Sequence, residues 1–393
     1  MSFGMGGGAG GVPNPNNDFQ VANPPGDGVS SLSWSPTANF LVATSWACDA
    51  DNVLCYEVQA NGQAVPKAAI KHDASVLCSA WNHDGSAVFS GAIRPVSTAS
   101  PVPPASFPCA RLPPPVLASA LTTSLPPIAP NPRPGGCDNQ AKKWDLATNQ
   151  PTQVAGHDAP IRHLAWIQEV NLLVTGSWDK TLKYWDTRQP SPALQVQLPE
   201  RCYALSVTHP LLVVGTAERH IQVYNLSNPQ VPYKQLMSPL KYQTRTVAAF
   251  PNKQGYLVGS IEGRVAVNHV EESLQSKNFT FKCHREQTDI YSVNDIKFHP
   301  QHGTFVTCGS DGVFNFWDKD SKQRLKQMAK CNAPIPCGGF NRDGSIFAYA
   351  VSYDWSKGGA DPMASNGQNN IFLHAVTETE VKPRPASQSR GRR

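Results

Sequence analysis

Hydrophobic and polar residues alternate most regularly in LVTGSWDKTLKYWDTR, the stretch from Leu173 to Arg188. The hydrophobic run from Leu172 to Gly176 predicts one strand, and the alternation from Thr181 to Trp185 predicts a second. Asp179 lies between them and favours a tight turn. Two strands joined in this way and closed by Trp-Asp are typical of the middle of a four-stranded propeller blade, whose repeat is about 40 to 45 residues.

The Trp-Asp position recurs along the chain and can be used to count blades. From Trp144 onward the intervals are 41, 39, 44 and 49 residues, all close to the expected period. Seven occurrences predict an all-β fold, a seven-bladed WD-repeat β-propeller. They are Tyr56-Glu57, Trp144-Asp145, Trp185-Asp186, Tyr224-Asn225, Asn268-His269, Trp317-Asp318 and a degenerate IFLHAV stretch near Phe372.

The interval from Tyr56 to Trp144 is 88 residues, about twice the period. Residues 92–135 explain it, because these 44 residues contain 13 prolines, no acidic residue and one aromatic residue. Such a segment can neither pair regularly in a sheet nor bury a core. We interpret it as a long disordered insertion in the turn between the second and third strands of blade two. An alternative or misprocessed transcript with no role for the segment fits the same composition.

The propeller is expected to span residues 18–381. A ring left open would expose two sheet edges, so we predict that a strand near Asp18 to Ala22 completes the last blade as its outer strand. The Gly-rich N-terminus, residues 1–17, and the basic tail, residues 382–393, are predicted to be disordered.

The net charge of +5 comes from the tail. Residues 382–393 contain five basic residues and no acidic one, so the remainder of the chain is formally neutral. The charge therefore does not indicate a basic folded domain that wraps nucleic acid.

Ten cysteines are scattered without a C-x-x-C pair, which favours buried, reduced thiols over disulfides or zinc. No run of eighteen apolar residues and no signal-peptide pattern is present. A soluble protein of the nucleus or cytosol, without membrane insertion, is expected.

One set of residues in blade three resembles a catalytic triad. His157, a hydroxyl from Thr175 or Ser177, and Asp179 could form a Ser-His-Asp arrangement, or they could form a buried hydrogen-bonded chain that ends at Trp185. The chain is favoured, because an active site has no reason to repeat. The set recurs in part in blade two (His72, Asp138, Trp144) and blade six (His284, Asp311, Trp317).

No phosphate-binding loop, H-E-x-x-H or G-x-S-x-G motif is present. His299 and His302 flank a proline, and we interpret them as turn residues rather than metal ligands. The sequence therefore predicts a non-enzymatic protein without metal or cofactor.

Two groups of residues are candidates for binding. Arg264 begins a predicted strand after a turn and could bind a partner carboxylate, or it could pair locally with Glu262. A second group follows the Trp-Asp of blade six. It would form a positive rim suited to stacked bases or an acidic peptide, although a solvated, charge-protected edge strand fits equally well. Its members are Phe281, Trp317, Lys319, Lys322 and Arg324.

Several stretches that blade geometry does not require resemble the Rae/Gle-type mRNA export factors of the nuclear pore. The likeness covers about residues 18–385 apart from the insertion, which the family pattern lacks. The stretches are LVTGSWDKTLKYWDTR, LPERCYALSV, VGTAERHIQVYNL, GSIEGRVAV, NFTFKCHR and SYDWSKG.

This resemblance implies a propeller that binds the acidic GLEBS segment of an FG-repeat nucleoporin and supports mRNA export. It places Arg264 at the nucleoporin contact and the positive rim beside a messenger ribonucleoprotein or single-stranded RNA. Microtubule or spindle-checkpoint proteins are further partners that it implies. The expected locations are the nucleus, the nuclear envelope at the pore, and the cytoplasm.

A different class of protein fits residues 173–188 as well. The stretch also resembles the WD-x-R box of substrate receptors for cullin-type ubiquitin ligases. Asp179, Trp185, Asp186 and Arg188 are at the matching positions, and Arg188 would contact the ligase adaptor. The two roles are compatible with each other.

Overall fold

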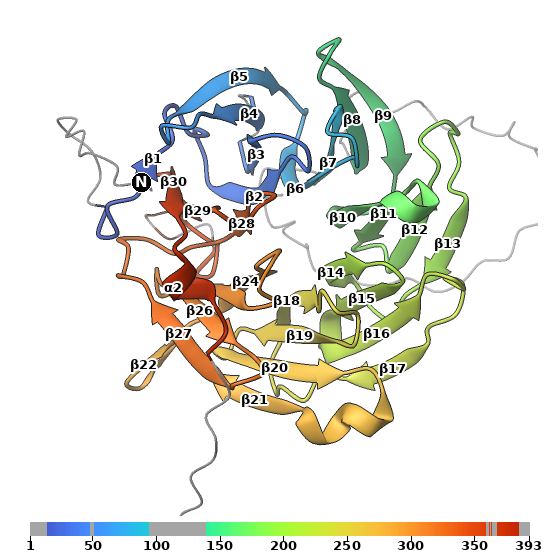
Figure 1. Ribbon diagram of the computed structural model, residues 1–393. Coiled ribbons are helices and arrows are strands. Elements are labelled where there is room, and N and C mark those ends of the chain that lie inside the picture. Colours follow the sequence, from blue (N-terminus) through green and yellow to red (C-terminus); the bar gives the residue numbers. More distant parts are fainter. Residues whose placement is uncertain are drawn as a thin grey trace, which may run out of the picture.

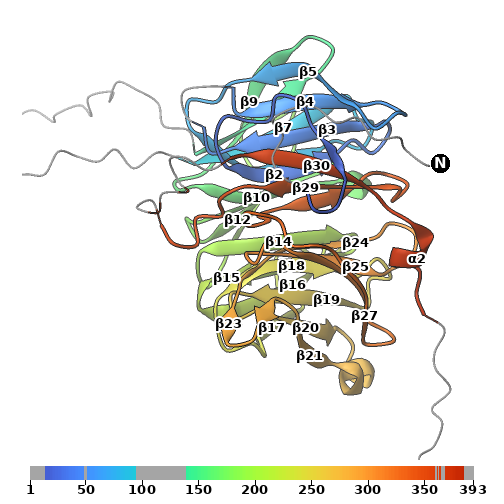
Figure 2. The same cartoon turned by 90° about the vertical axis from the view of Figure 1, so that its left-hand side faces the viewer.

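The computed structural model describes residues 14–47, 51–93, 139–358 and 368–384, together with Asp361 and Met363. It is a ring of seven four-stranded antiparallel sheets around a central axis (Figure 1), as predicted. Figure 2 shows the ring from the side. Each predicted Trp-Asp position lies on the third strand of its blade.

In blades one to six the strands follow the chain from the inner to the outer edge. Blade one contains β2 (Val29–Trp34), β3 (Phe40–Ser45), β4 (Val53–Val58) and β5 (Ala64–Ile70). Blade two contains β6 (Ser75–Trp81), β7 (Ala87–Ile93), β8 (Gln140–Asp145) and β9 (Gln150–Gly156). Blade three contains β10 (Ile161–Ile167), β11 (Leu172–Ser177), β12 (Thr181–Trp185) and β13 (Leu194–Gln197).

Blades four to six repeat this order. Blade four contains β14 (Cys202–Thr208), β15 (Leu211–Thr216), β16 (His220–Asn225) and β17 (Lys234–Met237). Blade five contains β18 (Thr244–Ala249), β19 (Gly255–Ser260), β20 (Arg264–His269) and β21 (Phe279–Lys282). Blade six contains β24 (Val293–Phe298), β25 (Phe305–Gly309), β26 (Phe314–Asp318) and β27 (Gln323–Gln327).

Blade seven joins the two ends of the propeller. It contains β28 (Gly338–Phe340), β29 (Ile346–Val351), β30 (Asn370–Ala375) and, as its outer strand, β1 (Phe19–Gln20). Phe19 pairs with Leu373 in antiparallel register. The predicted closure by the N-terminal strand is therefore confirmed.

The remaining elements are short. A two-stranded ribbon, β22 (Arg285–Glu286) and β23 (Asp289–Ile290), precedes blade six. The described 3-10 helices are η1 (Gln168–Val170), η2 (Ala217–Arg219) and η3 (Glu272–Lys277), and α2 (Glu378–Val381) follows the last strand.

The hydrophobic core lies between neighbouring blades. The second strands β15 and β19 are buried along their whole length, because each is covered by a blade on both faces. Val174 and Tyr184 of blade three, for example, share a cluster with Leu212 and Val214 of blade four. Full burial of such a side chain contributes about 1.5 to 3 kcal/mol, so the blades stabilise one another as a closed ring.

The boundaries differ slightly from those expected. Strand β7 continues through Ala92 and Ile93, so the chain leaves the sheet later than residue 92, and the rest of the 92–135 segment lies outside the described residues. The ordered chain also begins before residue 18, since Asn16 accepts a hydrogen bond from the amide of Ala329. Residues 1–13 and 385–393 of the predicted tails lie outside the described residues as well.

Six inner strands carry a β-bulge at the same place. In β2, β6, β10, β14, β18 and β24 the register shifts by one residue near the start of the strand. The extra residue of a bulge is left unpaired and its side chain is redirected. The six extra residues are Ser30, Leu77, Arg162, Tyr203, Arg245 and Asn294.

Candidate functional site: two charged surfaces on a hydrogen-bonded propeller

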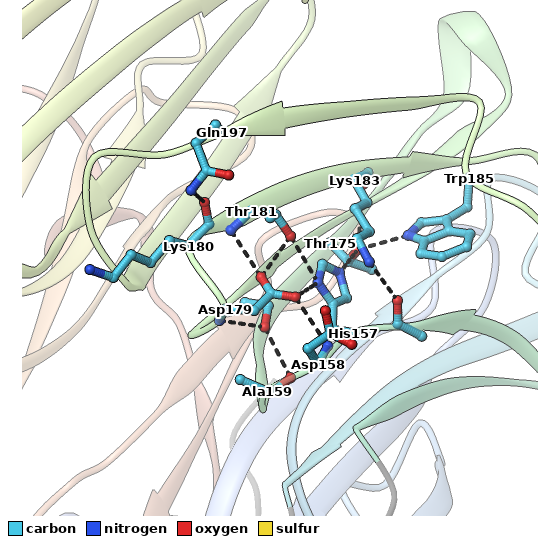
Figure 3. A network of polar contacts seen from close by, with 12 residues as sticks. His157, Asp158, Ala159, Thr175, Asp179, Lys180, Thr181, Lys183, Trp185 and Gln197 are labelled. Carbon is cyan, nitrogen blue, oxygen red and sulfur yellow. Dashed lines mark hydrogen bonds and ion pairs between the residues drawn. The ribbon is translucent and has the colours of Figure 1, made fainter. Parts of the chain in front are cut away.

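The His157 set forms the predicted hydrogen-bonded chain (Figure 3). His157 Nδ1 lies 2.8 Å from Asp179 Oδ2, and His157 Nε2 lies 2.7 Å from Thr175 Oγ1. The Trp185 indole donates to the same Thr175 oxygen at 2.8 Å. The hydroxyl in the chain is thus that of Thr175, because Ser177 donates to the carbonyl of Ala159 instead.

Burial and hydrogen bonding determine which side chains of this hydrogen-bonded chain are charged. Burial lowers the pKa of His157 and keeps the ring neutral. Burial acts against ionisation of Asp179, but hydrogen bonds from His157 and Thr181 outweigh it and lower the pKa of that carboxyl well below its usual range. The His157 side chain is 0% exposed, so no substrate can reach it, and the structural role is favoured over a catalytic one.

The chain recurs as predicted in blade six. His284 lies 2.9 Å from Asp311 and 2.9 Å from Thr307, and Trp317 donates to Thr307 at 3.0 Å. Blade two is different. His72 lies 2.7 Å from Ser90, but the Trp144 indole donates to Asn149, and Asp138 lies outside the described residues.

The WD-x-R residues fall into two groups. Asp179 and Trp185 belong to the buried hydrogen-bonded chain, whereas the largely buried Asp186 pairs with the exposed Arg188. Arg188 Nε and Nη2 donate to the two carboxylate oxygens of Asp186 at 2.8 and 2.7 Å. These hydrogen bonds lower the pKa of Asp186 to about 2. Arg188 is still 78% exposed, so its outer edge can contact a partner.

The structure brings the positive rim together where blades five and six meet. Lys322 Nζ lies 4.8 Å from the centre of the Phe279 ring, and Lys319 Nζ lies 5.3 Å from that of Phe250. The Arg324 guanidinium lies 5.8 Å from the centre of the Trp317 ring. The three cations of the rim, Lys319, Lys322 and Arg324, therefore lie over aromatic rings.

The aromatic residues of this site support the rim from below. Trp317 is 9% exposed, donates its indole proton to Thr307, and packs 4.7 Å from Phe281. Little of its face is free to stack on a base. Trp317 thus lies beneath the Arg324 guanidinium, and Phe281 packs against Trp317.

Arg264 lies on a different surface. Its Nε is 3.8 Å from Glu262 Oε2, longer than a hydrogen bond, and the side chain is about one third exposed at 32%. Glu262 accepts instead from the amide of Lys241. The local pair with Glu262 is thus present but loose, and the guanidinium can still bind a carboxylate of a partner.

Two exposed apolar residues beside Arg264 were missed from the sequence. Tyr242 and Ile261 are 58% and 39% exposed, and the amide of Ile261 donates to the carbonyl of Gln243. Their exposure could be inferred only from the ring, because the turn after β19 and the link before β18 meet there. Ile261 lies in the turn that leads into Arg264 at the start of β20, and its hydrogen bond to Gln243 joins this turn to the link that carries Tyr242.

The two surfaces lie at opposite ends of the strands. Arg264 begins the third strand of blade five, whereas Lys319 and Lys322 follow the end of the third strand of blade six. Equivalent strands run in the same direction in every blade. The turn between β7 and β8, from which the 92–135 segment leaves, is at the Arg264 end.

No metal site is apparent in the described part of the chain, where no three His, Cys, Asp or Glu residues cluster suitably. His299 Nδ1 accepts the amides of Gln301 and His302, which is the predicted turn chemistry. The seven cysteines among these residues are free, and six are buried. None of the described helices has the length and apolar character needed to cross a membrane.

Two comparisons place the chain among known proteins. The WD domain, G-beta repeat model matches residues 149–186 and 275–318. With seven such blades in a closed ring, the class is that of WD-repeat β-propeller proteins.

Full-length relatives define the family within this class. Protein RAE1 of Arabidopsis thaliana is 53% identical over 97% of both chains. The poly(A)+ RNA export protein of Schizosaccharomyces pombe is 45% identical over 94% of this chain and 93% of the relative. The mRNA export factor GLE2 of Chaetomium thermophilum is 43% identical over 95% and 94%. The chain belongs to the Rae1/Gle2 family of mRNA export factors.

Proposed function

We propose that this protein is a non-enzymatic scaffold of mRNA export that docks on an FG-repeat nucleoporin and contacts messenger ribonucleoprotein. Arg264, Tyr242 and Ile261 bind the acidic GLEBS segment, and the positive rim binds single-stranded RNA. Relatives of similar length are named as RNA export factors. The protein accordingly works in the nucleus, at the nuclear pore and in the cytoplasm.

The placement of the two surfaces is the observation that carries this proposal. Arg264 and the rim lie at opposite ends of the strands, so one propeller can hold a nucleoporin and an RNA at the same time. A scaffold that links cargo to the pore needs such separation. The spindle and checkpoint partners rest on the sequence resemblance alone.

A pull-down with an acidic GLEBS peptide tests the docking surface. Arg264→Glu should weaken binding about tenfold, because a reversed charge repels the peptide's carboxylates. Lys67→Glu is the matched control, since Lys67 is also exposed and paired with a glutamate, but it lies on the outer strand of blade one. Failure of the wild-type protein to bind, or equal losses in both variants, would contradict the assignment.

The same assay addresses the 92–135 segment. It leaves the sheet at the Arg264 end but from blade two, three blades away from blade five. If its deletion lowers peptide binding while the melting curve is unchanged, the segment has a role in docking. Unchanged binding and stability would support the transcript-variant explanation.

The ligase-receptor role is a second candidate, and the exposure of Arg188 favours it. Arg188→Ala is expected to abolish capture of the cullin-ligase adaptor while GLEBS binding stays at the wild-type level. Retention of adaptor binding by this variant, or no binding by the wild-type protein, would discard the role. Lys67→Ala, which also breaks an exposed ion pair, is the control.

A further inference from the structure

The central channel brings two arginines to one level. Arg162 and Arg245 are the bulge residues of β10 and β18, so they occupy equivalent positions in blades three and five. The inner strands β10, β14 and β18 lie side by side around the axis (Figure 1). Both arginines line a cavity of about 600 Å³ on the axis of the ring.

Positive charge exceeds negative charge in this cavity. Among the described lining residues, Arg162, Arg245, Lys297 and Arg342 are permanently cationic and Asp295 is the one acid. Asp295 is occupied, because its Oδ1 lies 3.2 Å from Lys297 Nζ and its Oδ2 accepts the amide of Gly338. Asp295 also attracts Arg162, but one carboxylate cannot balance four cations, so positive charge remains in excess.

The arginines themselves have few partners. Arg245 Nη2 donates to the backbone carbonyl of Asp354 at 3.3 Å. The Asp354 carboxylate is used elsewhere, accepting from Asn294 and Ser310. Within the described residues, no hydrogen bond or ion pair holds the Arg162 guanidinium. A guanidinium offers five N–H donors, so most of the donor capacity of the pair is unused.

Both arginines are half-buried, which makes this arrangement unfavourable when the channel holds only water. Removal from bulk water lowers the pKa of Arg162, and burial together with the nearby Arg162 lowers the pKa of Arg245. His163 beside them has its pKa lowered by burial and then by Arg162, Lys297 and Arg245, so it is neutral and adds no charge. A bound anion would relieve the repulsion between the two guanidinium groups.

We propose that the central channel is a binding site for a compact anion with several phosphate groups, held between Arg162 and Arg245. Planar guanidinium groups bind phosphate oxygens in a bidentate manner. Ser33 and Ser79 line the same cavity and supply hydroxyl groups. This site is independent of the nucleoporin and RNA surfaces. An inositol phosphate and an inorganic polyphosphate share the required chemistry.

Calorimetric titration and thermal unfolding of the full chain test the site. Inositol hexakisphosphate and tripolyphosphate are the two probes. Their relative affinities show whether the site prefers an inositol phosphate or an inorganic polyphosphate. One molecule should bind per chain, and saturation at about a hundred times the Kd should raise the Tm by about 3 °C. Arg162→Gln should weaken binding of the preferred probe at least about tenfold.

The positive rim could also attract these probes, so a matched variant is needed. Lys322→Gln combined with Arg324→Gln removes two cations from the outer surface and should leave probe affinity unchanged. Without any probe, Arg162→Gln should unfold at the wild-type temperature or above it, because one of two repelling charges is gone. Arg245→Gln provides the same test if Arg162→Gln does not fold.

Three results would overturn the proposal. They are no binding to the wild-type protein, unchanged affinity in the folded channel variant, and loss of affinity in the rim variant alone. A failed nucleoporin or RNA assay would leave the channel site unaffected, because neither assay uses the channel.

Discussion

Replacing Asp18 with alanine should lower the free energy of unfolding by about 3 kcal/mol at neutral pH, because a buried ion pair loses one partner. Asp18 precedes the closing strand β1, and its side chain is 5% exposed. Its Oδ1 lies 2.7 Å from His374 Nδ1 of β30, and its Oδ2 accepts from the hydroxyl of Tyr349 at 2.7 Å. The other ring nitrogen of His374, Nε2, lies 3.2 Å from Glu380 Oε2 of α2, so three parts of the chain close the ring together.

The same cluster predicts how stability depends on pH. Burial disfavours a charged His374, but hydrogen bonds to Asp18 and Glu380 outweigh it and raise the pKa of His374 to about 9. A raised pKa stabilises the fold fully below the unfolded value of about 6.5, and the contribution disappears as pH rises through about 9. The free energy of unfolding of the wild-type protein should therefore fall by about 3 kcal/mol across this window.

The contribution of Glu380 to stability changes with pH in the acidic range. Burial alone would raise its pKa, but hydrogen bonds from His374 and the amide of Thr377 lower it to about 2. Its contribution is present above the ordinary glutamate value and is lost as pH falls toward 2. Between pH 5 and 6 both contributions are present, so this cluster stabilises the ring most there.

Urea denaturation between pH 5 and 10 measures the effect of His374 and the effect of replacing Asp18. Asp18→Ala should differ most from the wild-type protein below pH 7 and least above pH 9, where His374 is neutral in both. Glu57→Ala removes an exposed pair with Lys67 and should cost less than about 1 kcal/mol. Equal stability of Asp18→Ala and wild type at pH 6 would show that the cluster does not close the ring.

The blade count could be predicted because it depends on local patterns, and the closing strand could be predicted because an open ring would expose two sheet edges. Each third strand ends near a Trp-Asp pair or a degenerate form of it. The alternation around Trp185 or Trp317 can be recognised without reference to distant residues. The His157 chain was also predictable, since its members lie within one blade. The interactions between distant parts of the chain were not predictable. His374 and Asp18 are 356 residues apart, and nothing local to either one indicates the other.

The same distinction applies to the functional surfaces: features within a short stretch could be predicted, whereas contacts between blades could not. The rim cations follow one another after Trp317, so their clustering was visible in the sequence. The burial of Trp317 was not, because it depends on Phe281 packing from the neighbouring blade. The two channel arginines lie at equivalent positions because β-bulges occur in two separate strands. A one-residue bulge leaves no pattern in the sequence.

Charge reversal of Lys322 and Arg324 should weaken binding of single-stranded RNA about a hundredfold at low salt. Both side chains are exposed and held over aromatic rings, so they present fixed positive charge to the phosphates. Each lost phosphate contact also lowers the dependence on salt, by a slope of about 0.7 for single strands. The double variant Lys322→Glu/Arg324→Glu should therefore reduce the slope of log K against log salt by about 1.4.

The salt dependence of binding distinguishes an RNA site at the rim from attraction of RNA to the overall charge of the protein. Lys67→Glu/Lys357→Glu makes the same change in net charge at two exposed positions outside the rim, and it should leave the slope unchanged while affinity falls less than about threefold. Fluorescence anisotropy with an oligonucleotide at several salt concentrations measures both quantities. If the two double variants lose affinity and slope equally, RNA responds to total charge and the rim is not its site. If the rim variant loses both while GLEBS binding is retained, the two ends of the strands act independently, as a carrier between cargo and pore requires.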